Sequence, residues 1–269
     1  MNWHKIWAII GKDIKEIKGN NMVLMPMIAV PILLGVVIPV VMTILVFTID
    51  VNMMNNAQMI ERILPFYSIP EHIDKTTEQI LYVFLNFSFL PLFMVIPVMV
   101  SSILTANSVV GEKERNTLET LLYTPVTNRE FIIAKLLGSF LPGAILSLLS
   151  FILYFISVNV ISYTLAGYII VNSPIWIPAM LLLSPALSIL GLAFTLMVSI
   201  KAKSFMEAQQ MSATIVIPII LLLIVQISGL VVFNTLYVTL FSIVLIIADY
   251  FLVTKITPRF DRERIISTL

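Results

Sequence analysis

The sequence contains no cysteine, which excludes disulfide bonds, thiolate metal sites and cysteine nucleophiles together. Charged residues are also scarce, at 12% of 269 positions against about a quarter in a soluble globular domain. No G-x-x-x-x-G-K-[ST] phosphate loop and no H-E-x-x-H zinc motif occur. The net charge of +1 gives no indication of a nucleic-acid partner. These absences exclude a soluble domain and leave no recognisable catalytic motif.

Hydrophobic residues, by contrast, make up 59% of the chain and are gathered in long runs. A helix needs roughly 20 apolar residues to cross a hydrocarbon core about 30 Å thick. Unpaired backbone groups are costly in lipid, so such runs form helices or a closed barrel. Barrel strands alternate polar and apolar residues, and these runs do not. The sequence therefore predicts an all-α membrane protein.

Six membrane spans are expected in a single domain that covers residues 1–269. No internal repeat or low-complexity linker divides the chain. The last two spans are separated only by residues 229–234, so this turn is a candidate to dip into the bilayer. The expected spans are 22–49, 80–108, 136–158, 174–200, 211–230 and 235–253.

The distribution of Lys and Arg predicts the orientation. The N-terminal segment, the loops at 109–135 and 201–210, and the C-terminal tail carry fourteen of these residues, and the opposite loops carry two. Positive residues remain on the cytoplasmic side. Both termini are therefore expected in the cytoplasm, and the N-terminus does not read as a cleavable signal peptide.

The N-terminal segment, residues 1–21, has the pattern of an amphipathic helix. Lysines occupy much of its other face, together with Asp13 and Glu16. A basic amphipathic helix that begins with tryptophan is typical of the membrane interface. It serves either as a passive anchor or as a lever that joins a partner to the first span. The apolar residues on one face are Trp3, Ile6, Trp7, Ile10, Ile14 and Ile17.

The loop between the second and third spans is much longer than a simple connection requires. After a charged start, the leucines of residues 118–122 have i, i+3, i+4 spacing, which predicts a short amphipathic helix over 111–125. Pro125 ends it, because the residue before proline avoids the helical region. Thr127 and Glu130 have capping-box spacing and start the next helix. A rigid element of this kind indicates a docking site.

This loop resembles the motif of ABC-2 type permeases, the membrane subunits of type V ABC exporters. The resemblance is carried by Thr117-Leu118-Glu119, Leu121-Leu122, Pro125 and Lys135, with Asn116 where glycine is more usual. In that family the loop is a coupling helix that docks into the ATP-binding subunit. The stretches 204–212 (SFMEAQQMS) and 260–265 (FDRERI) are similar to the sodium-extruding branch. The implied docking residues are Glu112, Glu114, Arg115, Thr117, Leu118, Glu119, Leu121, Leu122 and Pro125.

The resemblance also implies partners and a location. The chain would be a transport subunit rather than an enzyme, and it would bind no cofactor itself. A separate ABC ATP-binding subunit would hold ATP and Mg, and a second permease copy or homologue would complete the membrane part. A bacterial or archaeal plasma membrane is the implied location.

Polar residues inside the spans are the candidates for the transport pathway. In the family the second and fifth spans line the central path, which singles out Asn86 and Gln226, although helix packing is the alternative for both. Asp249 is the one carboxylate well within a span, where a charge is a functional hypothesis. It could instead pair with Lys255, Lys201 or Lys203. Ten of the 14 prolines lie in spans, as kinks that serve packing or hinges.

Two other classes of function remain open beside the exporter permease. A stand-alone ion-coupled secondary transporter or channel would use Asp249, and a membrane scaffold or sensor would normally carry a soluble domain. His4 and His72 lie on opposite sides of the membrane in the predicted orientation, so they form no shared metal site. Methionines 53, 54 and 59 are sparse support for copper. The sequence leaves sodium, a lipid, a peptide antibiotic and a drug open as substrates.

Overall fold

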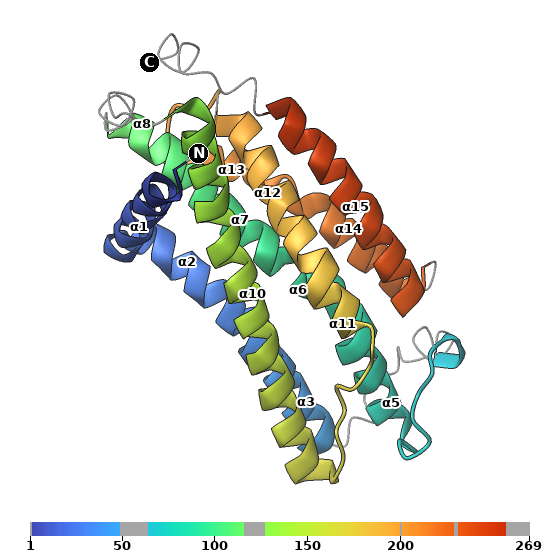
Figure 1. Ribbon diagram of the computed structural model, residues 1–269. Coiled ribbons are helices and arrows are strands. Elements are labelled where there is room, and N and C mark those ends of the chain that lie inside the picture. The colour runs from blue at the N-terminus through green and yellow to red at the C-terminus, as the bar shows by residue number, and fades with distance from the viewer. Residues whose placement is uncertain (1, 49–63, 116–126, 200, 229–230, 257–269) are drawn as a thin grey trace.

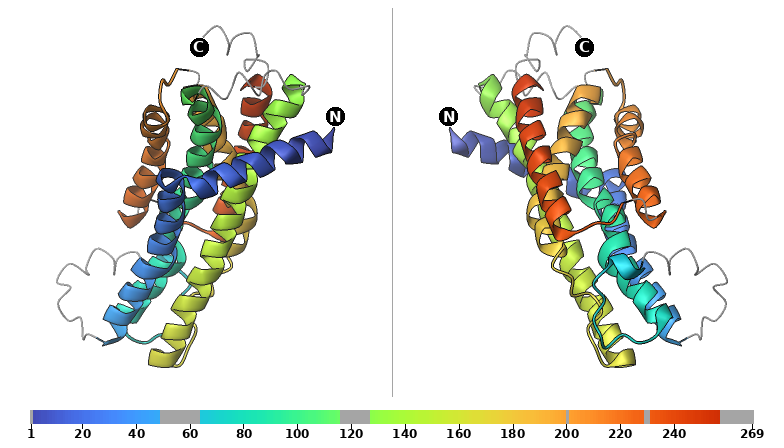
Figure 2. Two further views of the ribbon diagram at one scale, coloured as in Figure 1. Left: turned by 90° about the vertical axis from the view of Figure 1, so that its left-hand side faces the viewer. Right: turned by 90° about the vertical axis from the view of Figure 1, so that its right-hand side faces the viewer.

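The computed structural model describes residues 2–48, 64–115, 127–199, 201–228 and 231–256. Within these ranges the chain is helical and contains no β-strand. The first helix, α1, runs from Trp3 to Gly19 and crosses the long helices near one end of the bundle (Figures 1 and 2). A 3₁₀ turn at Leu64–Phe66 belongs to the loop at the other end.

Six helical segments of the described chain are long and apolar enough to span a membrane, as predicted. The second and third extend beyond the expected spans, because a helix continues past the hydrocarbon region wherever its backbone remains hydrogen-bonded. The six segments are α2–η1–α3 (Asn21–Ile32, Leu33–Val37, Ile38–Thr48), α5–η3–α6–α7–η4–α8 (Thr76–Val83, Phe84–Ser88, Phe89–Phe93, Val95–Ala106, Asn107–Gly111, Glu112–Glu114), α10 (Asn128–Ala166), α11–η5–α12 (Trp176–Pro178, Ala179–Leu183, Ser184–Ser199), α13–α14 (Phe205–Ala213, Val216–Ile227) and α15 (Thr235–Ile256).

Several spans are interrupted by π-helical turns, and proline accompanies most of them. The turn η1 lies between Pro31 and Pro39, and η5 lies between Pro178 and Pro185. Proline cannot donate its backbone hydrogen bond, so the ladder slips by one residue nearby. The turn η4 has no proline and lies where the second span meets α1. The proline-containing parts of these spans therefore include local changes of helix type.

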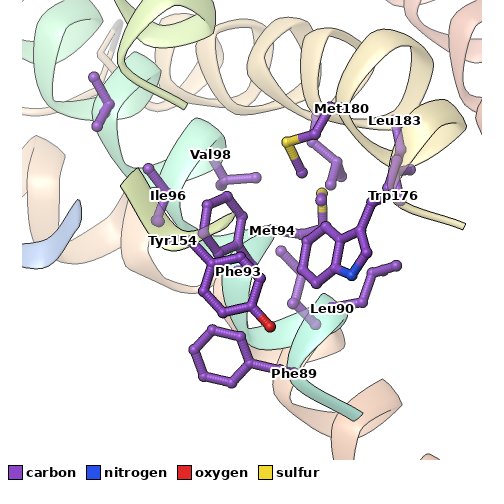
Figure 3. Packing of buried hydrophobic residues seen from close by; sticks show 14 of the residues in the cluster. Phe89, Leu90, Phe93, Met94, Ile96, Val98, Tyr154, Trp176, Met180 and Leu183 are labelled. Carbon is purple, nitrogen blue, oxygen red and sulfur yellow. The ribbon is translucent and has the colours of Figure 1, made fainter. Parts of the chain in front are cut away.

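The second span is the centre of the bundle. In its most apolar stretch 78% of the residues are buried, against 17% for the fifth and sixth spans. An aromatic cluster, shown in Figure 3, packs it against the third and fourth spans. Phe93 meets Trp176 edge-on at 5.6 Å, and the Tyr154 ring stacks on Phe89 at 5.6 Å. The Tyr154 hydroxyl donates to the Leu85 carbonyl at 2.8 Å, which satisfies the one polar atom of that ring.

Close helix contact between the second and fourth spans depends on Gly191. A Cβ added there would lie 2.7 Å from Ser101 Oγ and 2.9 Å from the Val98 carbonyl oxygen. No side chain fits at that distance. Small residues allow membrane helices to approach in this way, since van der Waals packing provides much of their association energy.

The fifth and sixth spans form a shorter hairpin on one flank of the bundle. In Figures 1 and 2 α14 and α15 end well short of the far ends of α3, α5 and α10. α14 packs on α6 and α7, whereas α15 packs on α12 and η5. The two arms therefore rest on different parts of the bundle.

Candidate functional site

The most polar region of the described chain lies where α1 crosses the end of the second span and the start of α10. Six charged side chains meet there: three carboxylates and three cations. We call this the charge cluster; it consists of Lys12, Asp13, Glu16, Glu112, Arg115 and Lys135.

Lys135 is the central cation of the charge cluster. Its Nζ lies 3.1 Å from both carboxylate oxygens of Asp13 and 2.9 Å from Glu112 Oε1. Ser108 donates a further hydrogen bond to Asp13 at 2.9 Å. Asp13 and Lys135 are each 4% exposed and Glu112 is fully buried. These three groups thus tie α1, the second span and α10 together.

The other half of the charge cluster is closer to solvent. Lys12 pairs with Glu112 and also approaches Glu16 at 3.6 Å, and Arg115 pairs with Glu16. Burial by itself would lower the pKa of Lys12, but the hydrogen bond and negative charge of Glu112, with Asp13 and Glu16, raise that pKa above its ordinary value. Lys12 therefore stays positively charged at neutral pH.

The charge cluster is balanced, which is what a buried group of ions requires. Three negative side chains face three positive ones, so few charges are left without an opposite partner near by. Asp13, Glu16 and Glu112 lie within 4.8 Å of one another, a spacing that could hold a metal ion. Lysine and arginine side chains already provide the positive charge among them, so the arrangement is explained as a structural ion network.

The apolar face of α1 is divided between protein and surroundings. Ile6 and Ile10 pack with Phe131 of α10, whereas Trp3 and Trp7 are more than half exposed. The sequence assigned all of these apolar residues to one face, and the structure uses only part of it for packing. Exposed tryptophans on a helix that crosses the bundle are suited to the headgroup region, so the interfacial placement remains a prediction that this geometry favours.

The placement of Asp13 on the polar face of α1 was wrong. Ile6, Ile10, Asp13 and Ile17 follow one another at spacings of 4, 3 and 4, which places all four on one face of the helix. All four are buried, so Asp13 lies on the buried face. This position was a signal that the sequence contained, because a carboxylate in an apolar stripe needs a buried cation. Lys135 provides that cation.

Contacts of α1 reach the chain on both sides of residues 116–126. Before that segment, Glu112 and Arg115 belong to the charge cluster. After it, the backbone N–H of Asn2 donates to Glu130 at 2.6 Å. The capping box predicted from Thr127 and Glu130 is confirmed, with both of its hydrogen bonds formed. One helix thus holds both ends of the predicted coupling segment.

The predicted docking residues fall into two groups. Glu112 faces inward in the charge cluster, and Glu114 accepts a hydrogen bond from the backbone N–H of Phe205 at 3.1 Å. Together with Arg115 they fix the start of the coupling segment to α1 and α13. The remaining predicted residues lie outside the described residues: Thr117, Leu118, Glu119, Leu121, Leu122 and Pro125.

Asn86, predicted for the pathway, uses its whole side chain to hold the loop between the third and fourth spans. Its amide nitrogen donates to the carbonyls of Tyr82 and Ile170, and its oxygen accepts from the backbone of Asn172 and Ser173. Asn159 makes a similar pair of hydrogen bonds to Val171. No local pattern indicates this pair of bracing asparagines, since they are 73 positions apart.

Gln226, the other predicted pathway residue, is 1% exposed near the end of α14. Neither its amide nitrogen nor its amide oxygen has a hydrogen-bond partner of good geometry. The hydroxyl of Tyr67 lies close by: burial raises the pKa of Tyr67, and its contact with Gln226 partly offsets that rise. A buried amide left unpaired is costly, so this position is open to a ligand.

Asp249 is 2% exposed and lies on the buried stripe of α15 with Val238 and Ser242. The pairing with lysine that the sequence allowed is not formed. Lys201, Lys203 and Lys255 are exposed, and neither carboxylate oxygen of Asp249 has a hydrogen-bond partner within the described chain. The residue keeps its place as a candidate functional group.

Fold and site together define a helical membrane protein with a braced segment between its second and third spans. Comparison with family models matches residues 7–255 to the ABC-2 family transporter proteins. The chain belongs to this family, and the match includes the charge cluster and all six spans. No curated protein and no solved structure matches the chain.

Proposed function

We propose that this chain is the permease subunit of an ATP-driven ABC exporter and that a separate ATP-binding subunit docks on residues 111–125. The observation that supports this most directly is the family match over residues 7–255. The chain contains no phosphate-binding loop, so in this proposal the partner supplies ATP hydrolysis. A second permease copy or homologue completes the membrane part.

The charge cluster and the capping box explain how a push on the coupling segment reaches the membrane. Both ends of the segment are fixed to α1, one through Glu112 and Arg115 and the other through Glu130. Buried ion pairs and packed side chains do not stretch, so the segment, α1, the end of the second span and the start of the third move as one body. This motion is of the rigid-body kind that transporters use to change access. These contacts support the lever interpretation of α1.

The test is co-purification of the tagged chain in mild detergent from cells that produce it naturally. The variant Glu119→Arg with Leu122→Asp changes the charge and the apolar face of the coupling segment. A matched control, Glu71→Arg with Phe66→Asp, makes the same chemical change at exposed positions of the opposite loop.

We expect an ATP-binding protein to co-elute with the unmodified chain and the control, and to be lost from the coupling variant. Absence of such a protein from the unmodified chain in several detergents would overturn the proposal. If the coupling variant still co-elutes with the ATP-binding protein, the docking site does not depend on Glu119 and Leu122 and lies elsewhere on the chain.

A stand-alone ion-coupled transporter or channel is the second candidate, and the unpaired carboxylate of Asp249 is the observation that favours it. Ion coupling requires a membrane-embedded group that changes its charge or its partner during transport. In that case Asp249→Asn would abolish transport while leaving the amount of folded protein unchanged. Transport that persists in Asp249→Asn would rule out this residue as the coupling group.

A further inference from the structure

A cavity of about 270 Å³ lies between the two arms of the last hairpin, against α6 and α12 of the bundle. Its walls come from α6, η5, α12, α14 and α15, and every lining side chain is apolar apart from the hydroxyl of Tyr237. Pro218, Leu222, Tyr237 and Phe241 line it and are also exposed. The cavity therefore opens sideways, between α14 and α15, at the depth of the membrane spans. We call it the hairpin groove.

The hairpin groove is suited to a hydrocarbon chain. Apolar cavities of about 150 Å³ remain free of water and take up molecules the size of benzene, and this one is larger. It is nonetheless smaller than the roughly 300–1,000 Å³ of most small-molecule pockets. A single alkyl chain that enters from the bilayer would fill the groove. A bulky ring system or two alkyl chains would be too large for it.

Gln226 lies one helical turn beyond the apolar lining of the hairpin groove. Ile219 and Leu222, three positions apart, line the groove. Gln226 comes four positions after Leu222, so it lies on the same face of α14, one turn further along the helix. Within the described chain, neither the nitrogen nor the oxygen of its buried amide forms a hydrogen bond of good geometry. The hydroxyl of Tyr67, from the loop before the second span, lies near this amide.

The chemistry of an amide selects the headgroup. An anion would satisfy the amide N–H₂ of Gln226 but would be repelled by its carbonyl, and a cation would do the reverse. A hydroxyl or amide group both donates and accepts, so it can satisfy both atoms. Residues 64–75, the described loop that holds Tyr67, carry Glu71 and Asp74 against Lys75, a net negative charge that disfavours a negative headgroup.

We infer that the hairpin groove binds a transported substrate: an amphiphile with one alkyl chain and an uncharged, hydroxyl- or amide-bearing headgroup. The chain lies between α14 and α15, and the headgroup bonds to Gln226 and Tyr67. The inference rests on the proposed exporter function and names its class of substrate. Lateral opening of the groove lets the substrate enter from the lipid without crossing water.

The probe is a monoacylglycerol that carries a photoreactive diazirine on its single chain, added to the full-length chain in lipid nanodiscs. Labelled peptides are mapped by mass spectrometry, and unlabelled monooleoylglycerol or oleate is the competitor. We expect labels on peptides of α14 and α15, with monooleoylglycerol competing at least tenfold better than oleate. Equal competition by oleate would overturn the uncharged headgroup.

Three variants separate binding from folding. Leu222→Trp fills the mouth of the hairpin groove, and its control Leu221→Trp adds the same bulk to the exposed neighbour that does not line it. Gln226→Leu removes the headgroup contact together with a buried unpaired amide, so its thermal stability in detergent should stay the same or rise. We expect Leu222→Trp to lose labelling and Gln226→Leu to weaken competition about tenfold, the equivalent of one hydrogen bond.

Equal labelling of Leu222→Trp and Leu221→Trp would overturn the hairpin groove as the site, and unchanged competition in Gln226→Leu would overturn the headgroup contact. In membrane vesicles that hold the assembled transporter, ATP should reduce labelling of the groove. Labelling that does not respond to ATP would overturn the assignment as substrate. Absence of an ATP-binding protein from the purified unmodified chain would instead refute the proposed function, because that measurement does not involve the groove.

Discussion

Removal of Lys135 should release α1 from the bundle. The Lys135 Nζ is 4% exposed and lies 2.9–3.1 Å from oxygens of Asp13 and Glu112. The change Lys135→Met keeps a long apolar stem but leaves two buried carboxylates short of a cation. Breaking a buried ion pair from one side costs about 3–5 kcal/mol. Since about 1.4 kcal/mol is a factor of ten, docking of α1 should weaken by more than about 100-fold.

The absence of cysteine makes this measurable without background. A Cβ at Gly138 would lie 3.7 Å from Cγ1 of Ile10, close enough for a disulfide between Ile10→Cys and Gly138→Cys. The cross-linking rate in native membranes reports docking. A pair with Trp7→Cys, whose side chain is 57% exposed, is the control and should cross-link slowly throughout.

We expect Lys135→Met to lower the cross-linking rate at least tenfold. The double change Asp13→Asn with Lys135→Met removes one charge of each sign and should restore most of the rate. A rate in Lys135→Met that stays within twofold of the unmodified chain would refute the conclusion that the charge cluster holds α1. If the cross-linking rate stays low in the double variant, the fit of the side chains rather than the balance of charge holds α1 in place.

Four further predictions concern other parts of the molecule. Gly191→Ala should destabilise the protein by about 1–3 kcal/mol in thermal denaturation, because its Cβ would meet the backbone of Val98, whereas Gly11→Ala, with nothing within 4 Å, should not. Asn86→Leu should speed hydrogen exchange at residues 170–173, and unchanged exchange would contradict its bracing role. Asp249→Asn should leave melting in detergent unchanged or raise it, since no lysine pairs with the carboxylate, and a clear loss would reveal a missing partner. The pKa of Lys12 is raised in the folded state, so its stabilisation of α1 is complete below pH 10.5 and is lost as pH rises through the higher folded value; cross-linking of α1 that fell between pH 7 and 9 would contradict this.

The sequence was sufficient for the architecture because lipid allows few alternatives. In lipid the backbone groups of a long, non-alternating apolar run must be paired within the run, so the run is helical. Each run of about 20 residues is long enough for one span, so the number of runs gives the number of spans. Six such helices are present, and the capping box at Thr127 and Glu130 formed as predicted. These features depend on residues close together in the chain.

The site could be predicted only in part, because its contacts join residues far apart in the sequence. Lys135 was noted as part of a motif, but its partner Asp13 is 122 positions away and was assigned to the wrong face of α1. The hydrogen bonds from Asn86 to the loop between the third and fourth spans cross 84 to 87 positions, so its bracing role could not be read from local pattern. The sequence marked Gln226 as polar in a span, and only the structure shows that its amide is unpaired and aligned with an apolar groove.

The most direct test of the central claim is photocrosslinking in living cells with a photoreactive amino acid at Leu118, in the proposed coupling segment. The same amino acid at Tyr163, which is 63% exposed near the other end of α10, is the control. The account predicts a cross-link to an ATP-binding protein from position 118 and none from position 163. Cross-links to such a protein from both positions, or from neither, would contradict an ATP-driven permease that docks its partner through residues 111–125.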